Sequence, residues 1–225
     1  MTNLELCQRL RAEAGIAGSG PTTVVSQTGE LGRIVDWVAS ANEEIQNAHA
    51  TWKFLQESFS FSTVDGTQDY APADVSLDDL ANWKHSRVDD LTIYSAVADE
   101  QYLIYLPWND FKGNYMFGST RSQEGRPTIV TVKPDNSLAL WTTPDAVYTV
   151  TGEYYKKAQL MTLDADEPLI PSQYHMIVVW RALMLYGAYS SAPDSYSHGE
   201  QEYKNLLRKL EFDQLNRIGY GAPLA

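Results

Sequence analysis

The fold is decided by residues 31–55, which read LGRIVDWVASANEEIQNAHATWKFL. Apolar side chains return here every three or four residues, the spacing that lines one face of an α-helix. These apolar positions are Leu31, Ile34, Val35, Val38, Ala41, Ile45 and Ala48. Polar side chains occupy the opposite face, so the pattern predicts a long amphipathic helix with one buried side.

Three aromatic side chains are predicted to anchor this helix. Trp37 lies within it, and Trp52 and Phe54 follow its end. Large rings bury much apolar area, so we expect them to fix the helix to the structure that follows.

Three further helices are predicted. The first runs from Thr2 to about Ala14, because Thr2 and Glu5 form a capping box. Another starts near Pro171, and its middle, Ile177 to Tyr186, is apolar on nearly every face, as in a helix buried all round. The last helix carries on one side Tyr203, Leu206, Leu207 and Leu210.

The chain between these helices predicts β structure. The alternation from Phe59 to Val64, the turn Asp65-Gly66 and a return through Tyr70 indicate a hairpin. A three-stranded antiparallel meander is predicted from three segments rich in β-branched and aromatic residues, Thr128–Val132, Leu138–Trp141 and Tyr148–Tyr155. Leu106 to Phe111 indicates a short helical turn between the two clusters.

The predicted fold class is therefore α+β. Residues 1–55 and 168–217 are expected to form a discontinuous helical domain, a bundle of about four helices. Residues 56–167 form an inserted antiparallel β unit, and residues 218–225 form a flexible tail because two glycines and a proline oppose helix formation.

The net charge, the cysteine content and the apolar stretches of the chain argue against several classes of protein. The formal charge is −12, from 29 acidic and 17 basic residues. Such a chain repels phosphate backbones, which disfavours tight nucleic-acid binding but suits the wall of a channel along which a strand slides. A single cysteine and no basic segment before an apolar run predict a cytoplasmic setting without a secretory signal. The most apolar stretch, 176–189, is interrupted by Arg181 and is too short for a membrane span, so no membrane anchor is expected.

No catalytic, cofactor or metal constellation is predicted. The histidines at 49, 85, 175 and 198 lie in four different segments without ligand spacing. Carboxylates at 78–79, 89–90 and 164–167 offer either metal ligands, a glycosidase pair or solvated turns, and turns are favoured. Cys7 is either a nucleophile or a small buried residue, with burial favoured. We expect no enzyme activity.

The chain is rich in aromatic residues, with six Trp and fourteen Tyr. Side chains such as Tyr102, Trp108 and Phe111 supply contact area at low rotamer cost, which favours interfaces. They also stack on sugars, and plain core packing accounts for many of them. Arg181, within the most apolar helix, is either snorkelling or half of a buried ion pair.

Two runs carry a family resemblance. The first comprises Gly32–Val38, Asn42–Gln46 and Trp52–Leu55, and the second comprises Pro168–Pro171, Tyr174-His175 and Arg181–Leu183. Their order resembles that in head-to-tail adaptor (connector) proteins of tailed bacteriophages, from about Leu31 to Leu215. The inserted β unit is similar to that of tail tubular protein A and its relatives.

The resemblance implies a structural virion protein at the head-tail junction, assembled in the host cytoplasm. It implies a homo-oligomeric ring, expected to be dodecameric, that joins the portal protein to a tail or nozzle protein and leaves a channel through which DNA passes without specific binding. Candidate ring-interface residues are Trp180, Arg181, Met184, Tyr102, Trp108 and Phe111. Candidate portal contacts in the tail are Ile218, Tyr220, Pro223 and Leu224.

Two alternatives remain open from the sequence. One is a carbohydrate- or receptor-binding module that uses β-region aromatics such as Trp108 and Trp141. The other is an acid-pair hydrolase.

Overall fold

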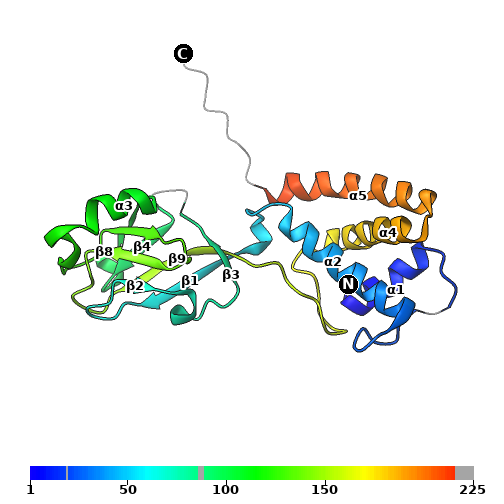
Figure 1. Ribbon diagram of the computed structural model, residues 1–225, viewed down its shortest axis with the longest axis horizontal. Coiled ribbons are helices and arrows are strands. Elements are labelled where there is room, and N and C mark those ends of the chain that lie inside the picture. The colour runs from blue at the N-terminus through cyan, green and yellow to red at the C-terminus, as the bar shows by residue number, and fades with distance from the viewer. Residues whose placement is uncertain (19, 86–88, 216–225) are drawn as a thin grey trace, which may run out of the picture. The chain divides into compact units, whose positions relative to one another are not determined.

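The computed structural model describes residues 1–18, 20–85 and 89–215. Its internal contacts divide the chain into two compact units (Figure 1). The helical unit comprises Met1–Leu55 and the chain from Ala158 onward, and the strand-bearing unit comprises Gln56–Lys157. Five α-helices and two sheets occur among the described residues, which confirms the predicted α+β class.

The described part of the helical unit contains four α-helices. They are α1 (Asn3–Glu13), α2 (Gly29–Asn47), α4 (Met176–Ser190) and α5 (Pro193–Gln214), with short 3₁₀ turns η1 (Lys53–Leu55) and η5 (Ser172–Tyr174). The predicted capping box opens α1: the Glu5 backbone N–H donates to Thr2 Oγ1 at 3.3 Å and the Thr2 N–H donates to Glu5 Oε2 at 2.9 Å. Two otherwise unpaired N–H groups of the first turn are satisfied in this way.

A single apolar core joins these helices. Its fully buried α2 members are Ile34, Val38, Ala41 and Ile45, and its α4 members include Ile177, Val178, Val179, Ala182 and Leu183. The amphipathic helix predicted from residues 31–48 is confirmed. The expectation that α4 is buried all round is too strong, because Trp180, Arg181 and Tyr186 remain partly exposed along it.

The α4 and α5 helices approach closely at two glycines. A Cβ on Gly187 would lie 2.8 Å from the Tyr196 backbone nitrogen, and one on Gly199 would lie 3.0 Å from the Trp180 carbonyl oxygen. Both distances are shorter than ordinary carbon contacts, so glycine permits this packing.

Residues 158–167, expected in the inserted β unit, lie in the helical unit. The Asn3 N–H donates to the Asp166 carbonyl at 2.7 Å, and Asp164 Oδ1 accepts from the Val24 N–H at 2.5 Å and from Thr23 Oγ1 at 3.0 Å. The acidic cluster thus serves as a hydrogen-bonded turn that holds the N-terminal segments.

Apart from residues 86–88, which are not described, the strand-bearing unit contains two sheets. Sheet A comprises β1 (Gln56–Ser62), β3 (Leu80–Trp83), β4 (Leu91–Tyr94), β5 (Gln101–Tyr102) and β9 (Thr149–Lys156). Sheet B comprises β2 (Asp69–Tyr70), β6 (Ile104–Tyr105), β7 (Ile129–Val132) and β8 (Leu138–Trp141). Helix α3 (Trp108–Tyr115) and the 3₁₀ turns η2 (Pro72–Val75), η3 (Val97–Asp99) and η4 (Gly118–Ser122) complete the unit.

Most predicted strand segments exist, but of the predicted strand pairings only that of β7 with β8 is correct. β1 pairs with β9 and β2 with β8, so residues 59–70 form no hairpin. Within the predicted meander only β7 and β8 pair, and β9 lies in the other sheet. β6 runs parallel to β7, so the unit is not purely antiparallel. Local turn residues do not determine these partners, because each strand's buried face selects its sheet.

The two sheets and α3 form successive layers. Val130, Leu138 and Leu140 of sheet B share a core with sheet A residues such as Phe59 and Ile93. Ile129 and Ala139 point to the other side of sheet B, where they pack with the fully buried Phe111 of α3. Since side chains alternate along a strand, α3 covers the face of sheet B that is turned away from sheet A.

Candidate functional site

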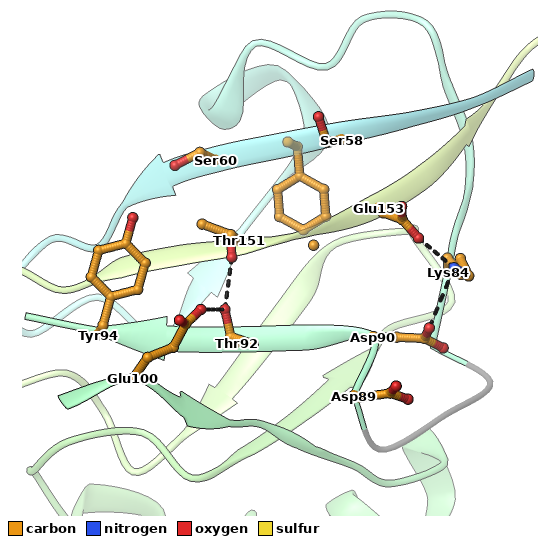
Figure 2. Close-up of a pocket in the computed structure, with 12 residues that line it drawn as sticks. Ser58, Ser60, Lys84, Asp89, Asp90, Thr92, Tyr94, Glu100, Thr151 and Glu153 are labelled. Atoms are coloured by element: carbon orange, nitrogen blue, oxygen red, sulfur yellow. Dashed lines mark hydrogen bonds and ion pairs between the residues drawn. The ribbon is translucent and has the colours of Figure 1, made fainter. Parts of the chain in front are cut away.

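The outer face of sheet A carries a concavity of about 830 Å³, shown in Figure 2. β1 contributes Ser58 and Ser60, β4 contributes Thr92, and β9 contributes Thr151. Their neighbours in sequence, such as Phe59, face the core, because the strand alternation places polar and apolar side chains on opposite sides. The floor of this concavity is therefore lined with hydroxyl groups.

Carboxylates surround this floor, so we call it the acidic concavity. Its described lining includes Asp89, Asp90, Glu100 and Glu153 together with one lysine, Lys84. Figure 2 shows the Lys84 amine between two of these acids: it donates to Glu153, and it lies 3.5 Å from Asp90 Oδ1. Thr92 Oγ1 donates to Glu100 Oε1 at 2.6 Å and lies 2.7 Å from Thr151 Oγ1.

The electrostatics of this concavity keep Lys84 charged. Burial on its own lowers the pKa of the Lys84 amine, but the hydrogen bond to Glu153 and the charges of Glu153 and Asp90 outweigh it and raise that pKa. An amine so held is an ion-pair partner rather than a proton shuttle near neutral pH. No group of three or more His, Cys, Asp and Glu side chains within the described ranges is placed to hold a metal ion.

A second concavity, of about 520 Å³, lies alongside α3. Two cationic side chains, Lys112 and Arg121, line it with Trp108, Met116 and Phe117. Phe117 is 80% exposed, an unusual state for a phenylalanine. Arg121 is held in place because its Nε and Nη2 donate to the Met116 carbonyl at 3.1 and 2.8 Å. We call this surface the basic concavity.

Both concavities are open surfaces that suit recognition of a partner.

The pKa of the Cys7 thiol, in the helical unit, is raised to about 12 by burial and then by the charge of Asp164. This thiol is fully buried and protonated at neutral pH, so the prediction of a small buried residue is confirmed and a nucleophilic role is not supported.

Comparison with family models places this geometry in context. The model described as SU10 adaptor protein matches residues 1–225. The chain belongs to the SU10 adaptor protein family. A search of curated proteins found no match.

Membership of this family confirms the resemblance to phage head-tail adaptors and makes the protein a structural adaptor of a phage particle, in a family that is not one of enzymes. The narrower likeness to tail tubular protein A stays a prediction. None of the adaptor's described helices is long and apolar enough to cross a bilayer.

The adaptor's predicted anchor residues lie in the helical core or at its margin. Trp52 is fully buried, its Nε1 donates to the Ile45 carbonyl at 3.1 Å, and its ring stacks on Phe54 with centroids 5.2 Å apart. Trp37 is half-buried, 5.7 Å from the Tyr186 ring. The ring of Trp52 thus ties the end of α2 to the following turn.

The ring-interface candidates on α4 of the adaptor differ in their surroundings. Arg181 Nε donates to Glu44 Oε2 of the same chain at 2.6 Å, and this pair is partly exposed. Met184 is buried, whereas Trp180 is half-buried and packs edge-on against His198. Of the three, Trp180 and Arg181 present atoms to solvent.

The candidates in the strand-bearing unit are separated by exposure as well. Tyr102 is 60% exposed on the edge strand β5, Trp108 is half-buried beside the basic concavity, and Phe111 is fully buried. Phe111 is therefore a core residue. Ile218, Tyr220, Pro223 and Leu224 lie outside the described residues.

The aromatics invoked for a sugar-binding alternative are largely occupied. The Trp141 ring lies 4.3 Å from that of Tyr115, and its Nε1 donates to the Thr120 carbonyl at 3.0 Å. The Trp108 ring stacks on Phe111, with centroids 6.2 Å apart. These rings hold α3 on sheet B, which leaves less free face for stacking on a ligand.

The sequence singled out Trp108 and the carboxylates at 89–90, but not the other residues that line the two concavities. Ser58 and Ser60 alternate with Phe59 and Phe61, a visible signal of a polar strand face, but their partners Thr92 and Thr151 come from distant strands. Lys112 and Arg121 lie nine positions apart and meet only because η4 folds back beside α3.

Proposed function

We propose that this adaptor forms a homo-oligomeric ring, dodecameric in number, that joins the portal protein to a tail or nozzle protein and leaves a channel for DNA. The observation that carries the proposal is the match of an adaptor family model to the whole chain. A closed ring requires that two different surfaces of one copy meet in its neighbours, so that a repeated rotation closes.

The charge of the chain supports a channel role. A net charge of −12 disfavours retention of a DNA backbone, so the strand passes without specific binding. Trp180 and Tyr102 offer partly exposed aromatic surface for contacts within the ring or with tail proteins. The C-terminal residues Ile218, Tyr220, Pro223 and Leu224 are proposed to contact the portal.

The test is the mass of the adaptor alone and in the presence of portal rings, measured by native mass spectrometry. We expect a monomer or small oligomer alone and a full ring of copies on the portal. Absence of binding under assembly conditions would overturn the proposal.

A second measurement addresses the C-terminal segment. Deletion of residues 217–225 is expected to weaken attachment to the portal while the circular dichroism of the helices stays unchanged. Loss of helical signal would instead assign these residues to the folded core, and unchanged attachment would remove them from the portal contact.

A further inference from the structure

The strand-bearing unit carries its two concavities on opposite faces. The acidic concavity lies on the side of sheet A away from the shared core, as the outward Ser58, Ser60 and Thr151 side chains show. The basic concavity lies beside α3, which covers the far side of sheet B. The order is therefore acidic concavity, sheet A, sheet B and α3, with the basic concavity beside α3, all within one unit.

The two surfaces are complementary in charge. Among the described residues that line them, the acidic concavity has four carboxylates and one ammonium group, and the basic concavity has two cations and no carboxylate. In a chain of net charge −12, a surface with two clustered cations and no acid is a departure from the average. Facing surfaces of opposite potential steer association and fix its register.

The basic concavity also carries exposed apolar area. Phe117 is 80% exposed and Met116 and Trp108 are half-buried beside it. Lys133 Nζ lies 5.7 Å from the centre of the Trp108 ring, but it is paired with Asp69 Oδ2 at 2.6 Å and adds no net charge at the rim. An aromatic anchor within a polar rim is the usual anatomy of a protein interface.

We infer that the basic concavity of one copy docks on the acidic concavity of the next copy, so that the strand-bearing units associate head to tail. This inference rests on the proposed ring and assigns the faces that meet in it. A second copy is the occupant because it carries the complementary surface on its opposite face, and a contact between two different faces of identical units propagates in one direction and closes into a ring. The Ser58, Ser60 and Thr151 hydroxyls would accept and donate hydrogen bonds to the incoming α3.

A charge exchange tests this docking with two full-length variants. The first, N109E/K112E, makes the basic concavity acidic at two exposed positions and leaves the Arg121 hydrogen bonds intact. The second, S58K/S60K/E100K, makes the acidic concavity basic at three exposed positions and leaves the Lys84–Glu153 pair intact. In a ring made of one variant alone, surfaces of like charge meet at every contact. In the mixture, the acidic surfaces of N109E/K112E meet the basic surfaces of S58K/S60K/E100K at every contact between unlike copies.

The expected result is loss and rescue of ring formation on portal rings. Either variant alone should bind with at least about a tenfold weaker apparent affinity, and the equimolar mixture should restore rings of alternating variants. A control matched to N109E/K112E is N82E/K157E, which makes the same charge change as that variant at exposed positions outside both concavities and should assemble like the unaltered chain. Thermal unfolding verifies that each variant is folded.

The outcomes separate this inference from the proposed function. Unaltered assembly of either single variant, or a mixture no better than its components, overturns the docking while the ring itself stands. If the unaltered chain forms no ring on the portal, both the proposed function and this inference fail. A variant that does not fold is replaced by its single substitution, K112E or E100K, which reduces the charge complementarity without reversing it, so that weaker assembly of the single variant is then the decisive result.

Discussion

The helical unit and the strand-bearing unit are assembled from contacts of different reach. Within α2 the buried residues Ile34, Val38 and Ile45 lie on one face because of helical periodicity. In sheet A the central strand β9 pairs with β1, β3 and β4, and its Gly152 lies opposite both Phe59 and Leu91. The first kind of contact is visible as a local pattern, whereas the second depends on partners far along the chain.

Because each unit has its own core, we expect a substitution that destabilises one unit to leave the other unit folded. Trp52→Ala, which has the largest expected effect, tests this expectation. Removing a fully buried indole leaves a cavity in the helical core, and we expect a loss of about 3–5 kcal/mol in stability. Hydrogen exchange of the helical amides reports the loss, while the Val150 amide in β9 should keep its protection.

The control for Trp52→Ala is Phe117→Ala, because that ring is 80% exposed and its removal should change stability by less than about 0.5 kcal/mol. If Trp52→Ala lowers the hydrogen-exchange protection of β9 as much as that of α2, the two units unfold together and are not independent in stability.

A matched pair of glycine substitutions addresses the strand-bearing unit. A Cβ on Gly152 would lie 2.5 Å from Leu91 Cδ2 and 3.0 Å from the Asp90 carbonyl oxygen, so Gly152→Ala should cost about 1–3 kcal/mol. Gly113 in α3 has open space around it, so Gly113→Ala should be neutral or stabilise by up to about 1 kcal/mol. Thermal unfolding of both variants gives the comparison, and equal effects would contradict the close packing at Gly152.

The same contrast explains how much of the molecule was predictable. The α+β class, the capping box at Thr2 and the stripe of α2 follow from short-range patterns and were predicted correctly. The partners of β1, β2 and β9 were not, because Asp65-Gly66 is a strong hairpin signal, yet here the Gly66 N–H donates to the Pro144 carbonyl and the flanking strands join different sheets. The concavities are formed by residues that these long-range pairings bring together, so the set of lining residues could not be predicted from the sequence. Several of these residues were recognisable only as polar positions on strands.

Acid is expected to loosen the helical unit through His175. The N-terminal amine lies 2.8 Å from its Nδ1, and its Nε2 donates to the Ile170 carbonyl at 2.8 Å. Burial, and also the positive N-terminus, lower the pKa of His175, so the folded state favours the neutral ring. Its contribution is present above the unfolded pKa of about 6.5 and is lost as the pH falls below that value, at no more than about 1.4 kcal/mol per pH unit.

Urea unfolding between pH 7.5 and 5 measures this dependence. His175→Gln should flatten it, whereas the exposed His198→Gln should leave it unchanged. A His175→Gln variant with an unaltered pH profile would show that other groups control the response to acid.

The smallest expected effect concerns two ion pairs, one in the helical unit and one in the strand-bearing unit, whose coupling free energies can be compared. Glu200 and Lys204 form the i,i+4 pair that α5 displays in the sequence, with a 2.7 Å contact between side chains 40% and 59% exposed. Such a pair is worth about 0.3–0.5 kcal/mol because water and salt screen it. The sequence spacing of Lys84 and Glu153 does not indicate that they form an ion pair. In the structure Lys84 is only 19% exposed and also forms an ion pair with Asp90.

Double-mutant cycles with Gln at each position should give a larger coupling free energy for Lys84–Glu153 than for Glu200–Lys204. The Lys84–Glu153 coupling should also be reduced less by 0.5 M salt than the coupling in α5. Equal couplings would mean that burial in sheet A adds nothing to the ion pair, and that the contact evident from local spacing counts as much as the one created by folding.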